Sequence, residues 1–126
     1  MSVRKPRPVF LNLLQIRFPV TAILSIAHRV TGVLLFLAMP FGIYLLGLSL
    51  QGPEGYARVV ELFAYRGVRI AAALLLWAYV HHLLAGVRFL LLDVDVGIDI
   101  RQARVTAWAT NLIGVAAFLM ALGGWW

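Results

Sequence analysis

Residues 21–50, TAILSIAHRVTGVLLFLAMPFGIYLLGLSL, form a long apolar run whose only charged residue is Arg29. This run exceeds the ~20 residues that an α-helix needs to cross the hydrocarbon core of a bilayer. Two further apolar runs, residues 68–92 and 105–126, approach or exceed the same length. The three runs predict an all-α integral membrane protein with three transmembrane helices.

The composition supports a single membrane domain over residues 1–126. The 126 residues are 63% hydrophobic and only 13% charged, whereas ordinary soluble domains carry about 25% charged residues. Residues 1–20 form a basic tail that we expect to be retained, because the apolar run behind it is too long for a signal-peptide core and no A-x-A-like site follows. Cysteine is absent, which excludes disulfides, thiolate metal sites and cysteine-ligated iron–sulfur clusters in this chain.

The positive charges lie at the edges of the apolar runs rather than on a soluble face, so the formal net charge of +6 does not indicate a nucleic-acid partner. Cytoplasmic flanks of membrane helices are enriched in lysine and arginine, which makes the distribution of these residues a guide to orientation. Arg4, Lys5, Arg7, Arg17, Arg101 and Arg104 flank one side, whereas Arg58, Arg66 and Arg69 flank the other. This asymmetry predicts a cytoplasmic N-terminus.

The connections between the runs are short. Pro40 removes one helical hydrogen bond, which predicts a kink near Met39. GPEGY, residues 52–56, predicts a turn, and residues 57–65 have the spacing of a short interfacial helix. Residues 93–104 predict a polar connection, most simply a solvated loop or docking surface. Trp108 near the start of the third run and Trp125 and Trp126 at its end suit the two aromatic belts of a bilayer.

The second apolar run contains HHLLAGVRFLLLD, residues 81–93, which places several special residues on one helix face. At 100° per residue, His82, Gly86, Phe89 and Asp93 fall within about 60° of one another. A buried imidazole can ligate haem iron, and the small side chains of Gly86 and Ala78, one turn to either side, leave room for a macrocycle. The same spacing also suits a histidine that hydrogen-bonds across a helix interface, where small residues are equally common.

His81 competes with His82 in sequence but points about 100° away on a helix. It shares a face with Arg88 and lacks a glycine one turn later. We therefore interpret His81 as a structural or solvent-linked residue. Arg88 and Asp93 could pair with partner groups or anchor the end of the helix.

The first run carries SIAHRVTG, residues 25–32, near its beginning. Ser25, His28, Arg29 and Gly32 fall within an arc of roughly 100°, so they can face one partner or ligand. A hydroxyl and a guanidinium one turn apart can donate to a carbonyl oxygen, and an imidazole or guanidinium can pair with carboxylates. The alternative is an interfacial helix start, in which Arg29 extends toward lipid headgroups and Ser25 bonds its own backbone.

Two segments together resemble a known family, the larger cytochrome b membrane-anchor subunit of bacterial succinate dehydrogenase. RPVFLNLLQIRFPVTAILSIAHRVTGV, residues 7–33, is similar to its first signature, with an S-I-x-H-R-x-[ST]-G stripe. HLLAGVRFLLLD, residues 82–93, is similar to its second signature, H-x-x-x-G-x-R-H-x-x-x-D. Phe89 departs from this pattern, since the family often has histidine there, which argues against a polar or proton-relay role at this position.

The resemblance implies a role for each matching residue. His82 corresponds to an axial ligand of haem b, with the second ligand supplied by the smaller anchor subunit. Ser25 and Arg29 correspond to residues that border the ubiquinone pocket, and His28 corresponds to a residue near the haem propionates, which Arg29 also contacts.

The resemblance also implies partners and a location. The three spans would form a helical bundle with the second anchor subunit in a bacterial inner membrane, beneath an iron–sulfur subunit and a flavoprotein subunit that carry out succinate oxidation. The expected substrate is ubiquinone or another quinone. The runner-up interpretations are a fumarate reductase anchor that works in the reverse direction, and a purely structural or transporter subunit.

Overall fold

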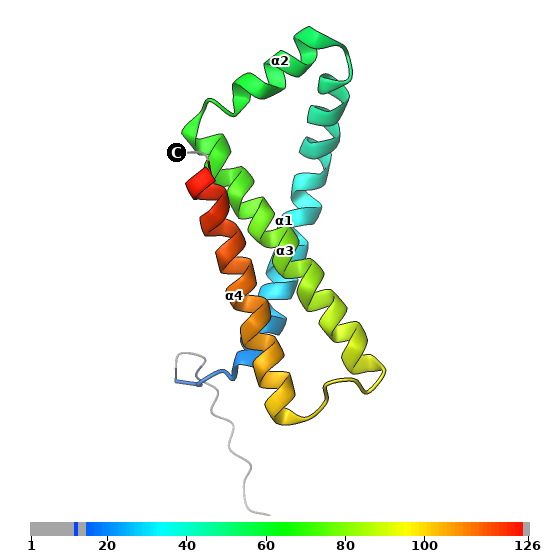
Figure 1. Cartoon of the computed structure of the whole chain (residues 1–126), viewed down its shortest axis with the longest axis vertical. Coiled ribbons are helices and arrows are strands. Elements are labelled where there is room, and N and C mark those ends of the chain that lie inside the picture. Colours follow the sequence, from blue (N-terminus) through cyan, green and yellow to red (C-terminus); the bar gives the residue numbers. More distant parts are fainter. Residues whose placement is uncertain (1–11, 13–14, 125–126) are drawn as a thin grey trace, which may run out of the picture.

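The computed structural model describes residue 12 and residues 15–124 (Figure 1). It contains four helices over these residues and no strand: α1 (Val20–Ser49), α2 (Pro53–Leu62), α3 (Arg66–Asp93) and α4 (Ile100–Gly124). The prediction of an all-α fold is confirmed. Arg4, Lys5, Arg7, Trp125 and Trp126, on which parts of the orientation and aromatic-belt predictions rest, lie outside the described residues.

The three long helices run in alternating directions. α2 connects the C-terminal end of α1 to the N-terminal end of α3 and lies across that end of the bundle (Figure 1). All three are long and apolar enough to cross a membrane. Most of their large apolar side chains are exposed, as expected for helices that face lipid or other subunits. The N-terminal end of α1, the C-terminal end of α3 and the N-terminal end of α4 therefore share one side of the membrane.

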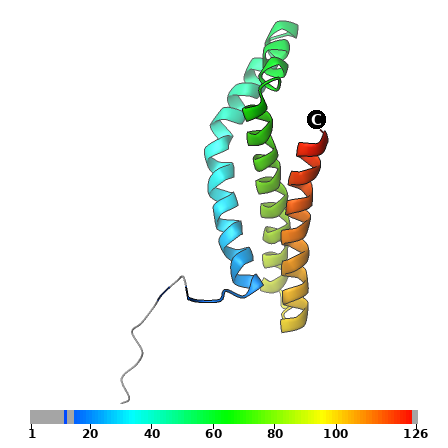
Figure 2. The same cartoon turned by 90° about the vertical axis from the view of Figure 1, so that its left-hand side faces the viewer.

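The helix boundaries follow local chemistry. Pro19 precedes α1, and its carbonyl accepts the N–H groups of Ala22 and Ile23. The helix continues through Pro40, and Figure 2 shows it as bowed rather than sharply kinked. A broken helical bond at proline can be absorbed by such a gentle bend when the surrounding turns stay regular.

The structure corrects the predicted boundaries of the short helix between the first two long helices. The GPEGY turn is confined to its first residue, Gly52, whose φ of 121° suits glycine. α2 starts at Pro53 and ends at Leu62, rather than covering residues 57–65. The early start follows from the sequence, because a proline and the acidic Glu54 both favour a first helical turn.

The third long helix begins at Ile100 rather than near residue 105. The Asp99 side chain accepts hydrogen bonds from the N–H groups of Arg101 and Gln102, at 3.0 and 3.3 Å, and so satisfies donors at the start of α4. The predicted polar connection is therefore shortened to the residues before this cap.

The small core of the bundle lies toward the end where α1 begins. Leu24, Ala85 and Ala107 are fully buried against one another, one from each long helix, and Val20 and Phe89 pack around them. Two alanines at this crossing let the backbones approach closely, as in other membrane helix pairs. This close approach sets the rotation of α3 between α1 and α4, and thereby decides where its polar residues point.

Candidate functional site

Two imidazoles from different helices stack in the interface between α1 and α3. The ring centroids of His28 and His82 are 4.1 Å apart, and their planes differ by only 6°. The ring of Phe89 meets His28 edge-on at 5.2 Å. The predicted faces of α1 and α3 are thus brought together, and Phe89 completes an aromatic stack at the position where the related signature often has histidine.

The hydrogen bonds of His82 define its tautomer. Its Nδ1 lies 3.0 Å from the carbonyl oxygen of His28, and a carbonyl oxygen can only accept. The Nδ1–H of a neutral His82 therefore donates to His28, which leaves Nε2 with a free lone pair. An imidazole held in this way is prepared to ligate a metal through Nε2.

His81 occupies the other side of α3. It is 1% exposed, and its Nε2 lies 3.0 Å from the side-chain oxygen of Asn111 on α4. Because that amide oxygen accepts, Nε2 carries the proton of a neutral His81. The remaining Nδ1 is buried and finds no hydrogen-bond partner among the described residues. His81 thus joins α3 to α4, in agreement with its structural interpretation.

The two small residues predicted to make room for a macrocycle have different surroundings. A Cβ atom added to Gly86 would lie 3.6 Å from Nε2 of His28, so this glycine gives the His28 ring its place beside α3. Ala78 is fully buried within the bundle. In this arrangement Gly86 faces the imidazole stack, whereas the surface of Ala78 is covered by the chain itself.

Ser25 and Arg29 lie on the outer edge of the α1 stripe. Ser25 is half-buried and Arg29 is exposed, whereas His28 and Gly32 turn inward toward α3. Arg29 borders a hollow of about 270 Å³ that is otherwise lined by Val30, Val33 and Leu34. A cation beside an apolar hollow suits a ligand with a polar head and an apolar body.

Arg88 is a polar residue whose role the sequence left open. It is 8% exposed, and it donates from Nε to the Thr106 hydroxyl at 2.9 Å and from Nη2 to the Ala103 carbonyl at 3.0 Å. These bonds hold its guanidinium against the first turns of α4. Arg88 therefore anchors the end of α3 within this chain.

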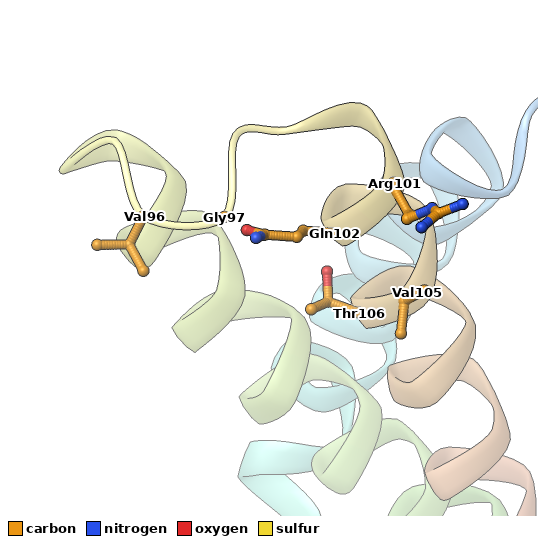
Figure 3. Close-up of a pocket in the computed structure, with 6 residues that line it drawn as sticks. All are labelled: Val96, Gly97, Arg101, Gln102, Val105 and Thr106. Carbon is orange, nitrogen blue, oxygen red and sulfur yellow. The ribbon is translucent and has the colours of Figure 1, made fainter.

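A second hollow, of about 420 Å³, lies beside the connection between α3 and α4 (Figure 3). The Gln102 side chain extends toward Gly97, and Thr106 lies beneath it, whereas Arg101 points away from Val96 and Gly97. Asp99 caps α4 at this end. Thr106 bonds Arg88 and the Ala103 carbonyl, so Asp99 and Thr106 serve the local fold here.

Nε2 of His82 has the donor chemistry that haem iron accepts. Over residues 12 and 15–124, no group of three or more histidine, aspartate or glutamate side chains is placed to hold a bare metal ion. His82 instead offers a single nitrogen donor in the interface between α1 and α3, and would hold a haem through it if haem were bound. The sequence could not reveal the acceptors of its Nδ1–H, because these depend on the rotation of α1 against α3.

The fold and site define a small helical membrane protein whose polar residues gather in its helix interfaces. The chain belongs to the succinate dehydrogenase/fumarate reductase transmembrane subunit family, whose model matches residues 3–121. It is accordingly a membrane-anchor subunit of an enzyme complex and does not itself contain the succinate-oxidising site.

Individual relatives agree over nearly the whole chain. The succinate dehydrogenase cytochrome b556 subunit of Coxiella burnetii is 35% identical over 120 residues, which cover 94% of this chain and 95% of the relative. The subunit of the same name from Rickettsia typhi is 28% identical, with 90% and 89% covered. The cytochrome b560 subunit of Reclinomonas americana is 32% identical, with 94% and 84% covered.

The His81–Asn111 pair generates a stability prediction. Asn111→Leu leaves the Nε2–H of His81 buried without an acceptor, which should cost about 1–3 kcal/mol of stability. The double variant His81→Phe with Asn111→Leu replaces both polar partners by apolar groups and should recover most of this loss. Thermal unfolding of the detergent-solubilised complex measures the change. The single variant His81→Phe completes the comparison. If the stability loss of the double variant equals the sum of the losses of the two single variants, the pair is not coupled.

Proposed function

We propose that this chain is the haem b-binding anchor of a succinate:quinone oxidoreductase. It contributes to the ubiquinone-reducing site and helps pass electrons from an iron–sulfur subunit to the quinone. The observation that carries the proposal is the fixed tautomer of His82, whose Nδ1–H donates to the His28 carbonyl and whose Nε2 is left as a donor. The names of the relatives, cytochrome b subunits of succinate dehydrogenase, support the same assignment.

His82 is the axial ligand in this proposal, and the second axial ligand comes from the partner anchor subunit. Bound haem supplies one-electron transfer. The α1 helix holds His82 in the correct tautomer. The His28 imidazole and the Arg29 guanidinium are the donor groups for the propionates. Gly86 supports haem-face packing by leaving room for the His28 ring. Ala78, the second small residue expected at this face, is covered by the chain itself and offers no surface to a haem.

Ser25 and Arg29 form the proposed quinone-binding pair. They lie one turn apart near the start of α1, and both can donate to a quinone oxygen. The apolar hollow beside Arg29 suits the hydrophobic part of a quinone. A hydroxyl and a guanidinium beside the quinone stabilise the negative charge that develops as the quinone is reduced.

The proposed assembly contains the second anchor, an iron–sulfur subunit and a flavoprotein subunit. We place it in a bacterial inner membrane with lipid around the exposed apolar faces and with a cytoplasmic N-terminus. Because the matching family also includes fumarate reductase subunits, a fumarate reductase anchor is the second candidate. The direction of electron flow then depends on the partner potentials and the quinone.

The axial role of His82 can be tested by spectroscopy of the complex purified with its native partners. His82→Ala should abolish the low-spin b-type spectrum, because Nε2 of His82 is the donor. His81→Ala is the matched control and should preserve that spectrum, since its Nε2–H is committed to Asn111. A spectrum lost in the His81 variant but unchanged in the His82 variant would overturn the assignment.

The quinone site can be tested by comparing two electron acceptors in one preparation. Ser25→Ala removes a neutral donor worth about 0.5–1.5 kcal/mol, and Arg29→Leu removes a charge-assisted donor worth about 1.5–3 kcal/mol. Quinone reduction should fall in both variants and further in Arg29→Leu, while succinate oxidation with a soluble artificial acceptor is retained. Equal losses with both acceptors would indicate an assembly defect, and full quinone activity in both variants would remove these residues from the site.

The orientation can be tested with reporter fusions. Three membrane-crossing helices and a cytoplasmic N-terminus require a reporter fused after Trp126 to be periplasmic. A reporter inserted between α3 and α4, near Gly97, should be cytoplasmic and serves as the control. The reverse pattern would place the starts of α1 and α4 away from a cytoplasmic iron–sulfur partner and would contradict the proposed assembly.

A further inference from the structure

Thr31 offers His82 a second hydrogen-bond acceptor. The Thr31 hydroxyl donates to the His28 carbonyl at 2.9 Å, and its Oγ1 lies 3.3 Å from Nδ1 of His82. Because the single hydroxyl proton is directed to the carbonyl, Oγ1 faces the imidazole as an acceptor. The Nδ1–H of His82 is therefore shared between the His28 carbonyl and the Thr31 hydroxyl.

Gly32 provides the surface against which the same ring rests. A Cβ atom added at Gly32 would lie 3.0 Å from Cε1 of His82, 3.5 Å from Nδ1 and 3.9 Å from Nε2. The first of these separations is closer than a methyl group and a ring carbon normally approach. A side chain at this position would therefore push the imidazole away from its two acceptors.

Thr31 is fully buried, so water does not compete with its hydroxyl for the His82 ring. It lies on the edge of α1 that packs against α3, next to the stacked pair of His28 and His82. The hydroxyl, the carbonyl and the glycine come from neighbouring positions of α1. Together they restrain the rotation of the His82 ring and the position of its proton.

We propose that Thr31 and Gly32 form a seat for His82 that sets the orientation of the imidazole and the electron density on Nε2. This proposal rests on the proposed axial role of His82. A ligand imidazole that donates its other N–H to good acceptors becomes a more basic donor to the metal. Thr31 is then a positioning residue that acts on the haem iron through His82, without touching the haem.

A purely structural role makes a different prediction. Threonine hydroxyls in helices often bond the carbonyl three or four residues earlier, with no further function. Removal of such a hydroxyl changes stability or haem content but leaves the electronic properties of the bound haem unchanged. The midpoint potential and the electron paramagnetic resonance spectrum of the haem therefore separate the two roles.

The test uses Thr31→Val, which removes the hydroxyl and preserves the branched shape, in the complex purified with its native partners. We expect the haem midpoint potential to shift to more positive values, because a less basic imidazole stabilises ferric iron less well, and the g-values to move with it. Thr31→Ser restores the hydroxyl and should return both properties to those of the parent. Thr110→Val makes the same change at a buried threonine of α4, the helix that His81 contacts, and should leave both unchanged.

Gly32→Ala tests the other half of the seat. We expect haem affinity to fall by about 10-fold or more, within the range found when groups supporting a metal ligand are removed. Gly42→Ala is the control on the same helix, since an added Cβ there meets nothing within 4 Å. Parental haem affinity in Gly32→Ala would contradict the seat.

The remaining outcomes are also decisive. A parental potential and spectrum in Thr31→Val would overturn the tuning role. A potential that shifts in Thr31→Val and returns to the parental value in Thr31→Ser would support the role of the hydroxyl, and an equal shift in both variants would contradict it. His82→Ala in the same series isolates the underlying assumption: a retained low-spin spectrum refutes the axial role itself, whereas its loss together with an unchanged Thr31→Val potential refutes only the seat.

Discussion

The absence of water from the bilayer interior is the constraint on which this structure depends, because every polar side chain placed there must find its partner within the protein. α3 carries three such side chains in its second half, and each bonds to a neighbouring helix, although Nδ1 of His81 finds no partner among the described residues. His82 takes its acceptors from α1, whereas His81 and Arg88 take theirs from α4. The small residues Ala85 and Ala107 allow the close helix contacts that these short bonds require. The close packing of α3 between α1 and α4 thus also provides the hydrogen-bond partners of its polar side chains.

The sequence predicted well those features that depend on one helix at a time. The length of the apolar runs defines the three long helices, and the 100° rotation per residue separates His81 from His82 before any packing is known. Features that depend on two helices could not be predicted. Thr31 falls within the first signature but has no role assigned there, and Asn111 looks like an ordinary helix residue in sequence. The hydrogen bonds of both residues appear only when the rotation of α1 and α4 against α3 is fixed. The early start of α4 was missed for a local reason, since Asp99 was interpreted as part of a solvated connection and not as a helix cap.

The α1 stripe shows how one motif can serve two surfaces. An arc of roughly 100° is wide enough for its two edges to face different neighbours. His28 and Gly32 turn toward α3 and contact the His82 ring, whereas Arg29 stays exposed beside an apolar hollow. A single short segment can therefore support a ligand histidine on its inner edge and present donors to a quinone on its outer edge. In the proposed function, this arrangement keeps the two redox sites close, and Arg29 is the side chain that they share.

The donor that this chain offers explains why a second anchor subunit belongs to the proposal. The proposal gives His28 to the propionates, and His81 bonds Asn111, so Nε2 of His82 is the one imidazole nitrogen of these three residues that the proposal assigns to iron. Low-spin haem needs a donor on each face, and the opposite face must then be served from outside the chain. The exposed apolar surfaces of the three long helices allow another helical subunit to approach. Binding of the haem and association of the two anchors would then stabilise each other, since a group that binds only the assembled state shifts the equilibrium toward it.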